Sequence, residues 1–374
     1  MTSRAQSKGI HGMAASFEQL LASPDIIWMG QNTTHLAPPR AVVEAMEESL
    51  AAREFQLYAP PGGFAELREL VVEDLGRAGF DAWITDGAVA GLHQICTVLG
   101  GEVSRLITTD PGWPWPGRFL GRSGIPVSAL DVYENPGRTL RAEQVAAVIE
   151  PRSIIYLIDP LNPLGSRYGR DELEAIVALA RETDSYIVHD CTYRHFASGH
   201  TLVADLSPDR TFTTYSFSKW LGLAGMRLGA VVARPELLAS IMAVPANPLG
   251  SSIVGQRGAI AGLRGREPWL EYVRSVNRAN IDRVEAVVAE TGLGEVVVPG
   301  SHGNFLAVDV SGSGLLADDV CERLLDEANV FIRPGTYQSP RFGERFVKIS
   351  TSVPTEWVER FADAWRALAL EPVR

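Results

Sequence analysis

Short apolar runs alternate with amphipathic stretches along most of the chain from about residue 80 onward. Four runs are rich in β-branched or aromatic residues and nearly uninterrupted: residues 152–160, 185–190, 211–216 and 227–233. Such runs are typical of strands that are buried on both faces of a sheet. Between the first two, the segment 170–182 begins with acidic residues and gathers its apolar side chains on one face, which predicts an amphipathic helix. A strand, helix, strand order favours an α/β fold with a mainly parallel sheet.

The composition and net charge of the chain argue against nucleic-acid-binding and membrane proteins. The chain has 374 residues, of which 46% are hydrophobic and 21% charged, so it can form one large or two medium globular domains. Its net charge is −11, from 45 acidic and 34 basic residues, and an acidic surface repels a phosphate backbone. No apolar run is long enough to span a bilayer, and the first residues lack the apolar segment of a secretion signal. We therefore expect a soluble protein with neither a nucleic-acid nor a membrane partner.

The three cysteines are far apart in the sequence and show no CxxC spacing: Cys96, Cys191 and Cys321. They are too few for a disulfide scaffold, which favours a reducing, cytoplasmic location. No metal site is expected.

Polar residues follow two of the predicted strands, and ligands of parallel sheets bind beyond the carboxyl ends of the strands. Asn162, between two prolines in "DPLNPLG", can donate to a phenolate oxygen. Asp190 in "HDCTYRHF" can pair with a protonated pyridine nitrogen, and Tyr193 can donate to the same phenolate. Taken singly, each of these residues is also compatible with an ordinary turn or a helix cap.

The stretch "YSFSKWLGLAGMR", residues 215–227, places Lys219 among apolar side chains. A lysine amine has an ordinary pKa of about 10.4 and becomes nucleophilic when it is desolvated or crowded by other cations. Ser216, Ser218 and Arg227 offer donors suited to a phosphate. A carbonyl bound to this lysine with a phosphate nearby suggests pyridoxal phosphate. The alternative is a strand end that runs into a glycine-rich turn with a surface lysine.

Two upstream segments can complete such a site. Residues 85–100 predict a glycine turn that opens a helix, whose first free amides, near Ala88 and Val89, suit an anion. Trp113 offers a flat face that can stack on a pyridine ring, although it is equally compatible with a core tryptophan beside a proline turn.

These motifs, in this order, resemble the fold-type I pyridoxal phosphate enzymes, in particular the class I/II aminotransferases and their histidinol-phosphate aminotransferase-like branch. The segments that carry the resemblance are Gly87-Ala88, Pro111-x-Trp113, Asn162-Pro163-x-Gly165, Asp190-x-x-Tyr193, Ser216-x-Ser218-Lys219 and Arg227. The resemblance implies a large domain over residues 45–262, with a mainly parallel seven-stranded sheet sandwiched by helices. It also implies a small α+β domain over residues 263–374, to which an N-terminal arm, residues 1–44, contributes.

The resemblance also implies roles for individual residues. Lys219 would form the internal aldimine with pyridoxal 5′-phosphate and shuttle a proton, while Asp190 would hold the ring nitrogen. The ring oxygen would be bound by Asn162 and Tyr193, the ring stacked by Trp113, and the phosphate bound by Ala88, Val89, Ser216, Ser218 and Arg227. Tyr58 would reach the phosphate from the neighbouring subunit, which implies a homodimer. Gly30, Asn162 and Lys348 are expected to contact the substrate.

The segment "RFVKIST" departs from the family pattern, because Lys348 stands where the family usually has the arginine that grips the substrate carboxylate. A guanidinium fixes the plane of a carboxylate with two hydrogen bonds, whereas an ammonium leaves it freer to rotate. Arg345 should face the other side of a regular strand. The leading interpretation is an aminotransferase; β-elimination, decarboxylation and oxidative deamination of an amino acid conjugate stay open. Further pocket candidates, each equally compatible with a packing role, are His35, Trp115, His195, Trp220 and Tyr337.

Two other classes are less well supported. A cofactor-sensing, DNA-binding regulator would need a basic surface and an added domain before Gly30, and neither is visible. A catalytically dead scaffold would leave the joint presence of the lysine, the aspartate, the arginine and both serines without a reason.

Overall fold

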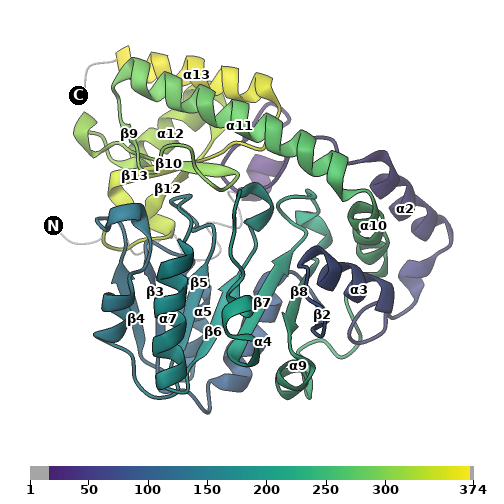
Figure 1. Cartoon of the computed structure of the whole chain (residues 1–374). Helices are drawn as coiled ribbons and strands as arrows, with labels where there is room; N and C mark the ends of the chain where they lie inside the picture. Colours follow the sequence, from purple (N-terminus) through teal and green to yellow (C-terminus); the bar gives the residue numbers. More distant parts are fainter. Residues whose placement is uncertain (1–16, 371–374) are drawn as a thin grey trace.

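The computed structural model describes residues 17–370 and shows a seven-stranded sheet with a smaller sheet above it (Figure 1). In spatial order the large sheet contains β2 (Asp81–Thr85), β8 (Gly229–Ala233), β7 (Thr211–Ser216), β6 (Tyr186–Asp190), β5 (Ile154–Ile158), β3 (Leu106–Asp110) and β4 (Val127–Asp131). Strand β8 runs antiparallel to both of its neighbours, β2 and β7, and all other pairs in this sheet are parallel. The predicted α/β fold with a mainly parallel seven-stranded sheet is therefore confirmed.

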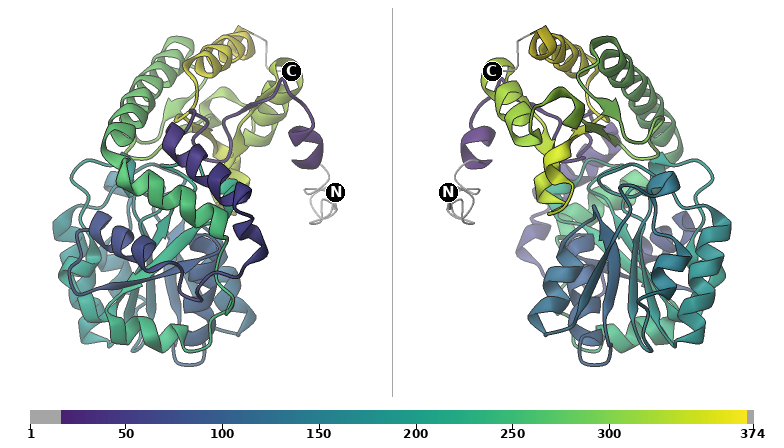
Figure 2. Two further views of the ribbon diagram at one scale, coloured as in Figure 1. Left: turned by 90° about the vertical axis from the view of Figure 1, so that its right-hand side faces the viewer. Right: turned by 90° about the vertical axis from the view of Figure 1, so that its left-hand side faces the viewer.

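Helices cover both sides of this sheet, as the two side views in Figure 2 show. In chain order they are α2 (Arg40–Ala51), α3 (Ala65–Asp74), α4 (Ala88–Leu99), α5 (Trp115–Arg122), α6 (Ala142–Ala146), α7 (Arg170–Glu182), α8 (Val203–Leu206), α9 (Pro235–Met242) and α10 (Ile253–Arg264). The bounds of α7 agree with the helix predicted over residues 170–182, and its predicted apolar face is buried: Leu173, Ile176, Val177 and Ala180. Among residues 17–370 no helix is both long and apolar enough to cross a membrane.

The smaller sheet is antiparallel, with the order β12 (Arg333–Pro334), β13 (Phe346–Ser350), β10 (Phe305–Asp309) and β9 (Glu295–Val296). It packs with α11 (Arg266–Thr291), α12 (Ala317–Ala328) and α13 (Thr355–Leu370). A short strand near the N-terminus, β1 (Ile27–Trp28), pairs in parallel with β11 (Val330–Phe331). The domain boundaries expected at residues 45 and 263 stay a prediction.

Successive side chains of β13 lie in two different environments. Val347 and Ile349 belong to the core between the small sheet and its helices. Phe346, Lys348 and Ser350 therefore face the opposite side, because successive side chains of a strand point to opposite faces. That side faces the large sheet, where Phe346 joins the core of the large sheet. A lysine at position 348 is thereby directed to the space between the two sheets.

The 26-residue helix α11 contacts β9 and β10 of the small sheet, and its early residues Trp269, Leu270 and Val273 belong to a core cluster that includes side chains of the large sheet (Figure 1). Near its start, Trp269 donates its indole N–H to the backbone carbonyl of Trp220 at 2.7 Å, next to Lys219. Further along, Asn280 donates to the carbonyls of Thr351 and Val353, both at 2.8 Å, just beyond the end of β13. One helix thus connects the segment after β7 with the segment after β13.

Candidate active site

A cavity of about 490 Å³ lies where the carboxyl ends of β5, β6 and β7 meet the small sheet. Every residue to which the resemblance assigns a cofactor or substrate contact, except Tyr58, lines it: Gly30, Ala88, Val89, Trp113, Asn162, Asp190, Tyr193, Ser216, Ser218, Lys219, Arg227 and Lys348. The side chains come together because parallel strands end at the same edge of their sheet.

Lys219 follows β7 in a turn that is anchored by fully buried neighbours, Phe217, Trp220 and Leu221. Its Nζ reaches the cavity, where it donates to the carbonyl of Gln31 at 3.0 Å. Burial, followed by the positive charge of Arg227, lowers the pKa of Lys219 to about 8, while Asp190 acts in the opposite direction. A lowered pKa increases the unprotonated, nucleophilic fraction of this amine near neutral pH.

Asp190 is the last residue of β6, and its carboxylate accepts four hydrogen bonds. Oδ1 accepts hydrogen bonds from the backbone N–H of Thr192 at 3.1 Å, from the Thr192 hydroxyl at 2.6 Å and from the Thr214 hydroxyl at 2.9 Å. Oδ2 accepts from the Tyr156 hydroxyl at 2.7 Å. Burial raises the pKa of Tyr156, and the charge of Asp190 raises it further, so the phenol keeps its proton and donates. The four donors stabilise a negative charge and fix its position.

Asn162 and Tyr193 lie side by side, joined by a residue that the sequence did not single out. The amide nitrogen of Asn32 donates to Asn162 Oδ1 at 3.2 Å and to the Tyr193 hydroxyl at 3.1 Å. Burial raises the pKa of Tyr193, although the hydrogen bond from Asn32 lowers it somewhat, so this phenol also stays protonated.

The start of α4 and the turn after β7 form a cradle of donors. Gly87 precedes the helix with φ at +86°, and a Cβ there would collide with the guanidinium of Arg227. Arg227 itself has a φ of +53° and donates to the carbonyls of Ala224 at 2.9 Å and Asp86 at 3.4 Å. The first amides of a helix beside an arginine and two serine hydroxyls suit a phosphate.

Two cations line the end of the cavity that the small sheet forms. Lys348 is buried, and its Nζ donates to Asn162 Oδ1 at 3.4 Å. Arg333 lies directly opposite it in the pairing of β12 with β13. Burial, followed by the charges of Arg333 and Lys219, lowers the pKa of Lys348 well below its ordinary value. Arg345, by contrast, pairs with Glu134 at 2.7 Å and Asp309 at 3.0 Å and does not line the cavity.

Several predicted pocket residues lie elsewhere. Tyr58 is 78% exposed and does not line the cavity of its own chain. His35 contacts Thr33 and the ring of Trp357. Tyr337 does line the cavity, and its hydroxyl accepts from the indole of Trp115 at 3.3 Å, so Trp115 lies one layer behind.

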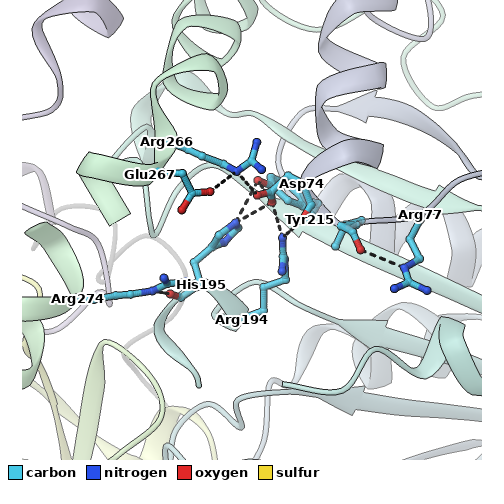
Figure 3. A network of polar contacts seen from close by, with 9 residues as sticks. Asp74, Arg77, Arg194, His195, Tyr215, Arg266, Glu267 and Arg274 are labelled. Atoms are coloured by element: carbon cyan, nitrogen blue, oxygen red, sulfur yellow. Dashed lines mark hydrogen bonds and ion pairs between the residues drawn. The ribbon is translucent and has the colours of Figure 1, made fainter. Parts of the chain in front are cut away.

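His195 and Trp220, pocket candidates that were equally compatible with packing, do not line the cavity. His195 belongs to a buried network around Asp74, whose carboxylate accepts from Arg194 at 2.5 Å, from His195 at 2.9 Å and from Tyr215 at 2.8 Å (Figure 3). Burial, followed by the charge of Arg194, lowers the pKa of His195 to about 4. The imidazole packs on the Trp220 ring at 4.8 Å between centroids, so both residues support the lysine turn from behind.

A cluster behind Asp190 resembles a metal site in composition, since His189, Cys191 and His200 lie close together. The Nδ1 atom of His189, however, already accepts from the backbone N–H of Val203 at 3.3 Å. Burial raises the pKa of Cys191 well above its ordinary value, so its thiol keeps a proton and lies 3.4 Å from the same Nδ1. These contacts engage the Nδ1 atom of His189 and the Cys191 thiol within the protein.

Several residues that line or contact the site were not predicted, among them Gln31, Asn32, Arg333 and Gln338. An unusual cation at position 333 on an otherwise apolar strand was the one available signal for Arg333.

Comparison with known proteins agrees with this geometry. A profile of the family "Aminotransferase class I and II" matches residues 24–364. An aspartate aminotransferase from Pyrococcus horikoshii is 27% identical over 353 residues, which cover 91% of this chain and 90% of the relative. A histidinol-phosphate aminotransferase from Methanothermobacter thermautotrophicus is 31% identical over 320 residues, covering 82% and 79%.

Solved structures show the same fold. An aminotransferase from Mycobacterium tuberculosis superimposes with a TM-score of 0.85 over 99% of this chain and 98% of its own, at 20% identity. The family profile spans most of the chain, and a relative above 30% identity covers more than two thirds of it. The chain therefore belongs to the class I and II aminotransferases, a family whose members transfer amino groups with pyridoxal 5′-phosphate.

Proposed function

We propose that the chain moves an amino group between an amino acid, or an amino-acid-like biosynthetic intermediate, and a keto acid, with pyridoxal 5′-phosphate attached to Lys219. The convergence of Lys219, Asp190 and Arg227 on one cavity is the observation that carries this proposal. An amine with a pKa of about 8, a fixed carboxylate and a phosphate cradle are the three groups that this cofactor requires.

The residues present fit the cofactor. Asp190, with its four donors, would hold the protonated ring nitrogen, and Trp113 would cover one ring face. The amides of Ala88 and Val89 would bind the phosphate together with Ser216, Ser218 and Arg227. The space for the phosphate exists because position 87 is a glycine, whose missing Cβ leaves the Arg227 guanidinium in place.

When bound, the cofactor serves as an electron sink for the substrate α-carbon. The protein supplies the proton transfer. Lys219, once free of its covalent link, would accept the proton of the substrate α-carbon and donate it again, a role that suits an amine whose pKa is lowered to about 8. Gln31, whose carbonyl accepts from Nζ at 3.0 Å, would orient the amine.

The substrate carboxylate would be bound by Lys348, with Arg333 beside it and Gly30 leaving room. A Cβ at Gly30 would lie 2.8 Å from the Phe331 ring, so a larger residue would push the N-terminal segment into the cavity or away from β11. The names of the relatives favour amino-group transfer over elimination or oxidative deamination.

A homodimer is part of the proposal. Tyr58 is exposed in a segment whose neighbours Phe55 and Leu57 are also exposed, at 59% and 66%. Apolar side chains gathered in this way mark an interaction surface. A second copy would cover them, and Tyr58 would reach the partner's phosphate cradle. Sedimentation of wild-type protein and of Tyr58→Asp should show a dimer and a monomer, respectively.

The decisive experiment uses freshly purified protein, pyridoxal phosphate and a panel of amino acids with and without a keto acid acceptor. We expect borohydride to fix the cofactor on Lys219, and product beyond one equivalent per active site to appear only when the acceptor is present. Lys219→Ala should lose both properties. Repeated turnover without an acceptor, or product formed with oxygen uptake, would instead support elimination or oxidation.

A further inference from the structure

Asn32 connects the small sheet to the two residues that face the cofactor ring oxygen. It is 1% exposed, lines the cavity and has a φ of +55°, in the left-handed region that asparagine tolerates better than most residues. This backbone turn directs its side chain away from β1 and toward the large sheet.

The orientation of the Asn32 amide is determined by its neighbours. Its backbone N–H donates to Ser350 Oγ at 2.8 Å, and its carbonyl accepts from Asn304 at 2.9 Å. Ser350 Oγ in turn donates to Asn32 Oδ1 at 3.4 Å. With the oxygen directed to Ser350 on β13, the amide nitrogen is directed to the opposite side, at Asn162 and Tyr193.

The Asn32 amide nitrogen donates to an oxygen of Asn162 and to the oxygen of Tyr193. The donor groups of these two residues are then left to face the cavity. Asn162 Oδ1 accepts from Asn32 and also from Gln338 at 2.9 Å and Lys348 at 3.4 Å, so its acceptor capacity is used. The Tyr193 oxygen accepts from Asn32, so its own proton must be donated elsewhere. Within residues 17–370, neither the Asn162 amide nitrogen nor the Tyr193 O–H donates to a protein acceptor.

We propose that Asn32 is a positioning residue that makes Asn162 and Tyr193 act together as donors to the anionic ring oxygen of the cofactor. The proposal rests on the proposed function above and adds to it a residue that need not touch the substrate. Asn32 also links these donors to β13, the strand that carries Lys348, through Ser350.

A pH titration of cofactor absorbance tests the proposal in the loaded protein. Donors to the ring oxygen withdraw negative charge from it, so the linking nitrogen next to it holds its proton less strongly. We expect Asn32→Ala to raise the pKa of the bound cofactor by about one unit, because one or two charge-assisted hydrogen bonds weaken. Asn32→Asp, nearly the same in shape but unable to donate, should shift it at least as far and serves if the alanine variant folds poorly.

A double variant that also changes Tyr193 distinguishes a positioning role of Asn32 from a general effect of the substitution on the protein. The shift caused by Asn32→Ala should become clearly smaller in a Tyr193→Phe background, because part of the effect passes through that hydroxyl. Asn280→Ala is the matched control, since Asn280 is buried and donates two hydrogen bonds from its amide nitrogen but does not line the cavity. It should lower stability and leave the cofactor pKa unchanged.

The outcomes are distinct from those that test the function itself. Wild-type protein that never attaches the cofactor to Lys219 would overturn both proposals. Normal attachment, with an unchanged cofactor pKa in both Asn32 variants or an undiminished shift in the Tyr193→Phe background, would overturn the role of Asn32 alone.

Discussion

Arg333 and Lys348 lie directly opposite each other on paired strands, and both line the same cavity. Within residues 17–370 neither forms an ion pair with a carboxylate, and the Arg333 guanidinium lies instead over the Tyr337 ring at 4.9 Å. Charges removed from water without a counterion are costly. The pair is therefore best explained by an anionic ligand that completes it.

Arg333→Gln should weaken substrate use. Loss of one hydrogen bond to a charged group corresponds to about 1.5–3 kcal/mol, so we expect kcat/KM to fall about ten- to a hundredfold. Steady-state kinetics measure the change. Arg345→Gln is the matched control, since Arg345 precedes β13, the strand that pairs with the strand of Arg333, but forms ion pairs at the surface with Glu134 and Asp309. Equal losses in the two variants would contradict a role for Arg333 in binding.

Lys348 should make anion binding dependent on pH. Its pKa is lowered in the free protein by burial, then by Arg333 and Lys219, and a bound carboxylate would raise it again. Binding then takes up a proton, so the affinity for a dicarboxylate analogue should fall as the pH rises above the pKa of the free amine. Titrations in buffers of different ionisation enthalpy would detect the proton.

Lys348→Arg provides the comparison, because a guanidinium stays charged over the whole pH range. Its anion affinity should change little with pH, and its proton uptake should vanish. A wild-type protein whose affinity is equally flat would show that Lys348 is already charged in the empty site.

Asp190→Asn should bind the cofactor and lose most of the rate. A neutral amide cannot stabilise a protonated ring nitrogen, and removal of one well-placed electrostatic contact slows enzymes by about a hundred- to a thousandfold. The amide would also face donors at Tyr156 and Thr214 with its own N–H groups. Single-turnover absorbance measurements should show a slow step after normal cofactor binding. A rate near that of the wild type would argue against the ring-nitrogen role.

Asp74→Asn should destabilise the fold more than it alters the chemistry. The variant leaves Arg194 buried without its counterion, and breaking a buried pair costs about 3–5 kcal/mol. Asp81→Asn is the matched control, because Asp81 pairs with Arg68 on the same helix in a half-exposed position and should cost about 0–1 kcal/mol. Urea unfolding measures both. Similar losses of unfolding free energy in the two variants would contradict a special contribution of the buried Asp74 network to stability.

The large sheet and its strand-end residues could be predicted because each depends on a local pattern. A continuous apolar run predicts a buried strand, and a polar residue at its end is then placed by the sheet itself. Asn162, Asp190 and Lys219 follow β5, β6 and β7 in this way. The cofactor end of the site is therefore visible in short stretches of sequence.

The substrate end could not be predicted in the same way. Arg333 reaches the cavity through the pairing of β12 with β13, and Asn32 reaches it through a left-handed turn held by Ser350, 318 residues away in the sequence. Trp220, which is fully buried, could not be assigned to pocket or core from the sequence, because the pattern around Lys219 does not show which neighbours turn back into the core.

Helix α11 has a consequence for how the enzyme keeps its geometry. At 1.5 Å per residue it is about 39 Å long, a single rod whose early turns hold the Lys219 segment and whose middle holds the end of β13. One helix thus bonds both to the segment that carries Lys219 and to the end of the strand that carries Lys348, and it helps to set the distance between them. Substitutions that weaken the packing of α11 would shift Lys219 relative to Lys348. A substrate would then fit the two residues less well, even where every residue that contacts the substrate is unchanged.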